Sequence, residues 1–119
     1  MNKILIVDDD QDFLDLITLE VNQLGWETTA VDNGYEALHI LRENVIDVVL
    51  TDIAMPDMDG YQLYKQIRNF NDEIPIIMMT GFGYDPNHVL VKARKSGLHD
   101  ILFKPFEISE LEEILNQYF

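Results

Sequence analysis

Cysteine is absent from the 119 residues, which excludes disulfides and thiolate metal sites within this chain. Long apolar runs are missing too: Ile4–Val7 runs straight into aspartates and is too short for a signal peptide or a membrane span. Basic residues are scarce, eight against 22 acidic ones. We therefore expect a cytoplasmic protein that neither inserts into a membrane nor binds nucleic acid directly.

The residues that are present describe one globular domain. A hydrophobic share of 47% with 25% charged residues is typical of folded domains, and the length suits a single core, so we expect one domain over residues 1–119. Residues 1–60 hold 14 acidic and two basic side chains, whereas residues 61–119 hold eight and six. This acidic first half favours a cation or a basic protein surface as its partner.

Short apolar runs alternate with helical patterns along the whole chain. Strands are predicted at Lys3–Val7, Trp26–Val31, Ile46–Thr51, Ile74–Met79 and Asp100–Phe103. Helices are predicted to begin near Asp10, Asn33, Asp59 and Asp85, with a last one over Ser109–Tyr118. Five such units predict an α/β fold, a doubly wound parallel sheet with helices on both faces. The alternation leaves the strand order open, although the flavodoxin-like order 2-1-3-4-5 suits five strands of this size.

Polar side chains stand where four of these strands run out. Asp8 and Asp9 follow the first strand, Asp52 the third, Thr80 the fourth and Lys104 the fifth. The carboxyl ends of parallel strands form one rim, where ligands bind. Three carboxylates on that rim repel one another and demand a cation, while the hydroxyl and the ammonium can receive an anion. The set predicts a site for Mg²⁺ and a phosphoryl group.

Four motifs in order carry a resemblance that covers the whole chain. They are Ile-Val-Asp-Asp at 6–9, Thr-Asp-Ile-Ala-Met-Pro-Asp-Met-Asp-Gly at 51–60, Met-Thr-Gly at 79–81 and Lys-Pro-Phe at 104–106. Each is weak alone, but together at matching strand ends they are specific. The chain resembles the receiver domains of two-component response regulators, including the chemotaxis regulators.

The resemblance implies how the rim accepts phosphate. Asp52 would be the phosphoacceptor, Thr80 and Lys104 would contact the phosphoryl group, and the peptide bond before Pro105 would be cis. Attack by a carboxylate on phosphorus forms an acyl phosphate, and the chemistry is mostly positioning and neutralisation of charge. Lys104 supplies part of that neutralisation.

The resemblance also implies a metal set. Asp8 and Asp9 would hold Mg²⁺, and the Asp52 carboxylate and the main-chain carbonyl of Ala54 would complete the protein's share. Mg²⁺ prefers six oxygen ligands and usually keeps several waters, so a few carboxylates and a phosphate suffice.

The function implied is that of a phosphorelay receiver in signal transduction. A histidine kinase or a histidine phosphotransfer protein would donate the phosphoryl group, and the change would alter affinity for a downstream protein or output domain. Such a domain is not an enzyme beyond its own phosphorylation and dephosphorylation. By family analogy, the output surface is the fourth helix, the fifth strand and the last helix.

One position departs from the family pattern. Three residues before Lys104 the family commonly has Tyr or Phe, whose rotamer reports phosphorylation, but this chain has Ile101. We hypothesise that Phe82, Tyr84 or Phe103 takes over part of that role.

Several polar residues have structural interpretations. We expect Asp10, Asp57 and Asp59 to be helix caps or turn residues, and the cluster Lys92, Arg94 and Lys95 to be a solvated face. His39, His88 and His99 lack metal-ligand spacing.

Two alternative functions stay open at this point. Asp8 and Asp10 mimic the Asp-x-Asp motif of haloacid-dehalogenase-type phosphatases, in which Asp8 would be the nucleophile, but the chain has no cap domain. A flavodoxin-like cofactor binder would need a Ser/Thr/Gly-rich phosphate loop after the first strand, and none is present.

Overall fold

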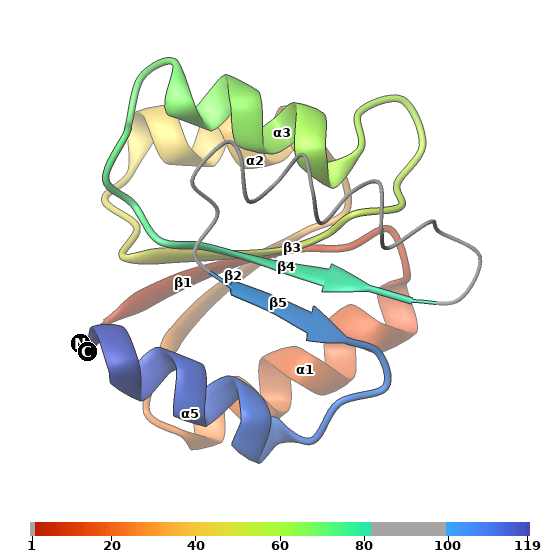
Figure 1. Ribbon diagram of the computed structural model, residues 1–119, viewed down its shortest axis with the longest axis vertical. Helices are drawn as coiled ribbons and strands as arrows, with labels where there is room; N and C mark the ends of the chain where they lie inside the picture. Colours follow the sequence, from red (N-terminus) through yellow and green to blue (C-terminus); the bar gives the residue numbers. More distant parts are fainter. Residues whose placement is uncertain (1, 82–99) are drawn as a thin grey trace.

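The computed structural model describes residues 2–81 and 100–119. Its strands are β1 (Lys3–Val7), β2 (Glu27–Val31), β3 (Val48–Asp52), β4 (Ile76–Thr80) and β5 (Asp100–Phe103). Its helices are α1 (Gln11–Gln23), α2 (Gly34–Glu43), α3 (Gly60–Arg68) and α5 (Ile108–Tyr118). All strands are parallel, in the order β2-β1-β3-β4-β5, which confirms the predicted fold class and strand order (Figure 1).

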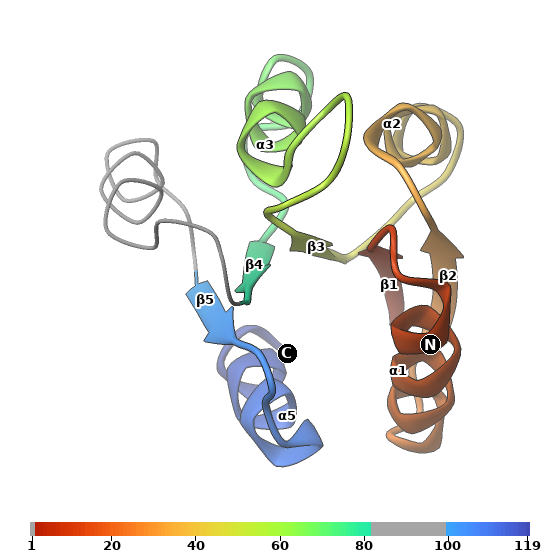
Figure 2. The same cartoon turned by 90° about the vertical axis from the view of Figure 1, so that its right-hand side faces the viewer.

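The sheet separates two helical layers, with α1 and α5 on one face and α2 and α3 on the other (Figure 2). Residues of β1 alternate between them: Leu5 and Val7 pack toward α2 and α3, while Ile4 and Ile6 pack toward α1 and α5. All four are fully buried, since neighbouring strands cover both edges of β1 and helices cover both faces.

The strands β3 and β4 lie further toward the carboxyl end of the chain than the sequence predicts. We predicted strand ends at Thr51 and Met79, but β3 ends at Asp52 and β4 at Thr80. The β3–β4 register continues to the pair Asp52–Met79, and the Ile53 amide donates to the Met79 carbonyl at 2.9 Å. Both strands also start later than predicted, at Val48 and Ile76. Backbone pairing thus includes Asp52 and Thr80, although the apolar pattern stops before them.

Acidic and amide side chains fix where the helices begin. Asp10 caps α1 by accepting from the Phe13 amide at 3.2 Å, and Asn33 caps α2. Asp59 and Gln62 form a reciprocal capping box on α3, so the predicted cap role of Asp59 is confirmed. The α5 helix starts one residue earlier than predicted, at Ile108.

Some predictions fall outside the described residues. They include the helix expected from Asp85 to Gly97, the basic cluster Lys92, Arg94 and Lys95, and the histidines His88 and His99. The third histidine, His39, lies in the described part of the chain and is exposed on α2. Within the described ranges, no helix has the length and apolarity to cross a bilayer.

Candidate functional site

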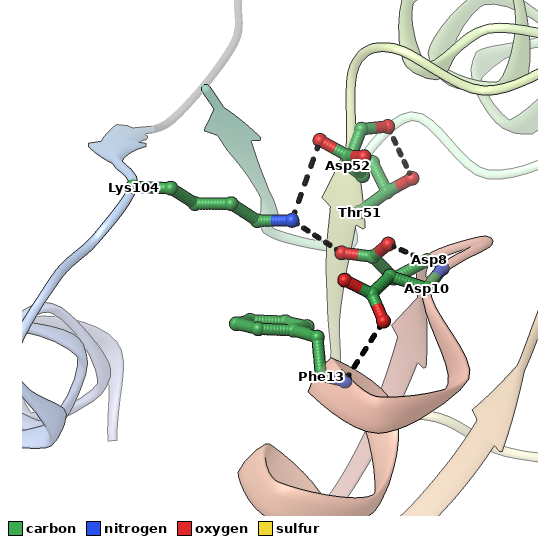
Figure 3. Close-up of polar contacts among 6 residues, drawn as sticks. All are labelled: Asp8, Asp10, Phe13, Thr51, Asp52 and Lys104. Carbon is green, nitrogen blue, oxygen red and sulfur yellow. Dashed lines mark hydrogen bonds and ion pairs between the residues drawn. The ribbon is translucent and has the colours of Figure 1, made fainter. Parts of the chain in front are cut away.

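Neighbouring strands deliver the predicted site residues to one rim of the sheet. Asp8 follows β1, Asp52 ends β3 and Thr80 ends β4. Lys104 follows β5, and its amide donates to the Thr80 carbonyl at 2.7 Å. Figure 3 shows the Lys104 side chain reaching across the rim toward Asp8 and Asp52. The structure thus brings together residues that are up to 96 positions apart in sequence.

Three carboxylates gather at the centre of this rim. Asp8, Asp9 and Asp52 each offer an oxygen that lies within 4.8 Å of the other two. Asp8 is fully buried and Asp52 is 8% exposed, whereas Asp9 is open to solvent. Buried carboxylates so close together repel one another in a medium that screens charge poorly, so the cluster favours a cation among them.

Lys104 supplies one positive charge to this cluster. Its Nζ lies 2.5 Å from Asp8 Oδ2 and 3.7 Å from Asp52 Oδ1 (Figure 3). The other Asp8 oxygen, Oδ1, accepts from the Asp10 amide at 2.9 Å. The peptide bond between Lys104 and Pro105 is cis, as the resemblance implies.

The environment of Asp52 disfavours its charge. The pKa of the Asp52 carboxyl is raised from its ordinary 3.8 to about 6, mainly by burial and also by the negative charges of Asp8 and Asp9. The Lys104 ammonium and the Ile53 amide act in the opposite direction on this pKa. One ammonium therefore leaves the three carboxylates under-neutralised, which fits a site for an additional cation.

Thr80 carries a buried hydroxyl with unused bonding capacity. The residue is 3% exposed, and its Oγ1 has no hydrogen-bond partner among the described residues. A buried hydroxyl without a partner costs free energy, so such groups usually serve a ligand or a second conformation. Its place at the end of β4, beside Asp52 at the end of β3, suits an incoming anion.

Close packing behind Asp52 fixes its backbone. Thr51 Oγ1 donates to the Asp52 carbonyl at 3.0 Å, and the Gly60 amide donates to the Ile53 carbonyl at 2.8 Å. A Cβ at Gly60 would overlap the Asp52 carbonyl oxygen. The loop after β3 can therefore return against the strand only because residue 60 has no side chain.

Comparison with known proteins decides the family. The model of the response regulator receiver domain matches residues 4–116. This chain belongs to that family. The transcriptional regulatory protein ZraR of Klebsiella oxytoca is 38% identical over 96% of this chain, and the regulatory protein AtoC of Escherichia coli is 37% identical over 98%. The chain spans about a quarter of the length of these curated relatives, 25% in each case.

Solved receiver structures agree with the fold. A receiver domain protein from Clostridium thermocellum has a TM-score of 0.92 and 30% identity, over 98% of this chain and 93% of that one. The response regulator TrrA of Thermotoga maritima, solved in complex with Mg²⁺-BeF, has a TM-score of 0.88 and 28% identity over the full length of both chains. These findings give no support to the phosphatase alternative.

Phe13 is a neighbour of this receiver site that the sequence analysis missed. Its pattern indicated only a residue on the apolar face of α1, yet its ring centroid lies 4.2 Å from Lys104 Nζ. Both residues also line an apolar hollow of about 450 Å³ between α1 and the segment joining β5 to α5. The contact joins the first turn of α1 to the residue that follows β5 and depends on the assembled fold, so the sequence held no signal for it.

The remaining predicted positions lie around the rim. Ala54 is exposed, two residues beyond Asp52. Ile101 is half-buried against the cluster under α2 and α3. Phe103 is 56% exposed and pairs with Thr80 in the β4–β5 register, and its reporting role stays a prediction. Phe82 and Tyr84 lie outside the described residues. Asp57 adopts a left-handed φ of 68°, as a turn residue does.

Proposed function

We propose that Asp52 is the phosphoacceptor of this receiver domain, which we take to comprise residues 1–119. An Asp52 carboxylate oxygen attacks phosphorus, the bond from phosphorus to the donor nitrogen breaks, and the product is an acyl phosphate. The observation that carries this proposal is the gathering of Asp52, two further carboxylates and Lys104 at the carboxyl ends of β1, β3 and β5. No turnover of a separate substrate is proposed.

We further propose that the acidic cluster holds Mg²⁺. The residues fit this ion because three hard oxygen donors lie within 4.8 Å of one another and two of them are buried. Asp8, Asp9, Asp52 and the main-chain carbonyl of Ala54 would be the ligands. When bound, the ion supplies charge neutralisation for phosphoryl oxygens. The Mg²⁺-BeF complex of TrrA supports the assignment by similarity.

Lys104 and Thr80 would respond to the phosphoryl group. The Lys104 ammonium already lies 3.7 Å from Asp52 Oδ1, and the Thr80 hydroxyl has no hydrogen-bond partner within the described part of the chain. A charge-assisted hydrogen bond contributes roughly 1.5–3 kcal/mol. Moving an equilibrium from 1:99 to 99:1 needs about 5.5 kcal/mol, so Thr80 alone cannot complete the switch and Lys104 must contribute.

The proposed partners follow from the family. A histidine kinase or a phosphotransfer protein would donate the phosphoryl group, and phosphorylation would change affinity for an output domain or a separate protein. ZraR is a transcriptional regulatory protein and AtoC a regulatory protein, and this chain matches 25% of the length of each. An output domain in the same polypeptide is therefore the form of partner that these relatives favour.

Labelling with acetyl phosphate and Mg²⁺ tests the proposal. We expect intact-mass measurement to show one phosphoryl group on the wild type and none on Asp52→Asn. Asp57→Asn is the matched control, because Asp57 lies exposed in the loop that follows β3 and Asn tolerates its left-handed backbone. This control is expected to label like the wild type.

Borohydride trapping then locates the phosphate. Reduction of the acyl phosphate should mark Asp52. Trapping at Asp8 would contradict the proposal, as would undiminished labelling of Asp52→Asn.

A further inference from the structure

The Lys104 ammonium lies between two carboxylates and an aromatic ring. Its Nζ is 2.5 Å from Asp8 Oδ2, 3.7 Å from Asp52 Oδ1 and 4.2 Å from the centroid of the Phe13 ring (Figure 3). A cation over the face of a ring is attracted at this distance. The ring and Asp8 therefore both hold the ammonium where it is.

The ring is itself fixed to the site through the start of α1. The Asp10 amide donates to Asp8 Oδ1 at 2.9 Å, and Asp10 Oδ1 accepts from the Phe13 amide at 3.2 Å. These bonds and the two contacts of Lys104 close a circuit of Asp8, Asp10, Phe13 and Lys104. Phe106 also packs edge-on against the Phe13 ring, with centroids 6.2 Å apart. The position of the ring is thus determined from two sides.

The circuit uses both oxygens of Asp8. Oδ1 accepts from the Asp10 amide and Oδ2 from Lys104, and the residue is fully buried. A divalent cation that takes Asp8 as a ligand therefore has to compete with the Lys104 ammonium for Oδ2. Whatever stabilises Lys104 in this place weakens the binding of the cation.

We propose that Phe13 is a positioning residue, which holds Lys104 against Asp8 in the metal-free protein and so sets how strongly a divalent cation binds. This inference rests on the proposed metal site. When a divalent cation displaces the Lys104 ammonium from Asp8, Asp52 is the other carboxylate near that ammonium. Cation binding would therefore leave Lys104 beside the proposed phosphoacceptor.

Calorimetric titration of the full chain with MgCl₂, in a phosphate-free buffer, tests this role. Phe13→Leu keeps an apolar side chain but removes the ring face, and we expect it to bind Mg²⁺ about two- to fivefold more tightly, the equivalent of one cation–π contact. Phe13→Tyr is the matched control, because it retains the face and should bind like the wild type.

A double-mutant cycle with Lys104→Met separates positioning from general packing. Lys104→Met removes the competing ammonium and should tighten Mg²⁺ binding more than Phe13→Leu does. In that background, Phe13→Leu should have no further effect. Circular dichroism of each variant checks that the fold is retained.

Three outcomes would overturn the inference. Phe13→Leu could bind Mg²⁺ with wild-type affinity, Phe13→Tyr could change the affinity as Phe13→Leu does, or the effect of Phe13→Leu could persist in Lys104→Met. A wild type that binds no Mg²⁺ would instead refute the metal site, and the inference with it. The two failures are therefore distinguishable.

Discussion

Each end of the sheet has an ion pair between a lysine and a carboxylate, and the two pairs differ in how exposed they are to solvent. At the amino end, Lys3 Nζ lies 3.8 Å from Glu27 Oε2, with side chains that are 47% and 55% exposed. At the carboxyl end, Lys104 Nζ lies 2.5 Å from Asp8 Oδ2, with side chains that are 21% and 1% exposed. The exposed pair is solvated whether or not it forms, whereas the buried pair replaces water that Asp8 has lost.

This difference shows what burial does to a charge at a strand end. At the amino end, the exposed Glu27 carboxylate is hydrated by solvent and needs no ligand to neutralise it. At the carboxyl end, three carboxylates share one lysine, and the pKa of Asp52 rises to about 6 because the group is buried beside two other acids. The buried acids at the carboxyl end of the sheet therefore destabilise the metal-free protein, and the same acids form a site for a cation.

The largest predicted effect compares two glycines at opposite ends of the sheet. Gly60→Ala should lower the free energy of unfolding by about 3 kcal/mol or more, since its Cβ meets the rigid backbone at Asp52, and should also reduce labelling by acetyl phosphate. Gly25→Ala, in open space with a φ of +95°, should cost about 1–2 kcal/mol and leave labelling intact. Urea unfolding measures both, and equal costs would break the comparison.

Removing each lysine tests the two ion pairs directly. In EDTA, Lys104→Met should lower the free energy of unfolding by about 3 kcal/mol, the low end for a broken buried pair, because Lys104 is partly exposed. Lys3→Met should change it by less than about 0.5 kcal/mol. Chemical denaturation at neutral pH gives both values. A comparable loss from Lys3→Met would show that burial is not what distinguishes the pairs.

Asp52→Asn should stabilise the metal-free protein at neutral pH. Because the folded pKa is raised from 3.8 to about 6, the folded state binds more protons than the unfolded state between these values, and wild-type stability falls as pH rises through this window. The shift sets a ceiling of about 3 kcal/mol, and we expect a gain of about 2 kcal/mol for Asp52→Asn at pH 7.

The pH dependence supplies the control for this prediction. As the pH falls below 3.8, the Asp52 carboxyl becomes protonated in the unfolded state as well as in the folded state, so the advantage of Asp52→Asn should disappear. Melting curves of the wild type and of Asp52→Asn in EDTA across the pH range measure this advantage, and a gain that is independent of pH would contradict the raised pKa.

The sequence predicted the strands and the rim because hydrophobic periodicity and strand-end polarity are local signals. It misplaced the ends of β3 and β4, since Asp52 and Thr80 end the apolar pattern while backbone pairing continues through them. It also missed the contact of Phe13 with Lys104. That contact depends on where the fold places the start of α1 relative to the residue that follows β5, which periodicity does not encode.

The pairing of Lys104 with Asp8 has the same origin. The resemblance implies that Lys104 contacts the phosphoryl group. In the metal-free structure its ammonium instead binds Asp8, the most buried carboxylate of the rim. Which of three acids a lysine selects depends on burial and reach, and both are properties of the assembled fold.

Thermal unfolding with and without Mg²⁺ tests the central claim most directly, namely that the carboxyl end buries its acids for a cation. At a Mg²⁺ concentration 100 times the dissociation constant, the account predicts that the wild type gains about 2.7 kcal/mol, while Asp52→Asn, lacking one carboxylate, gains clearly less. An identical melting temperature in Mg²⁺ and in EDTA for the wild type would contradict it.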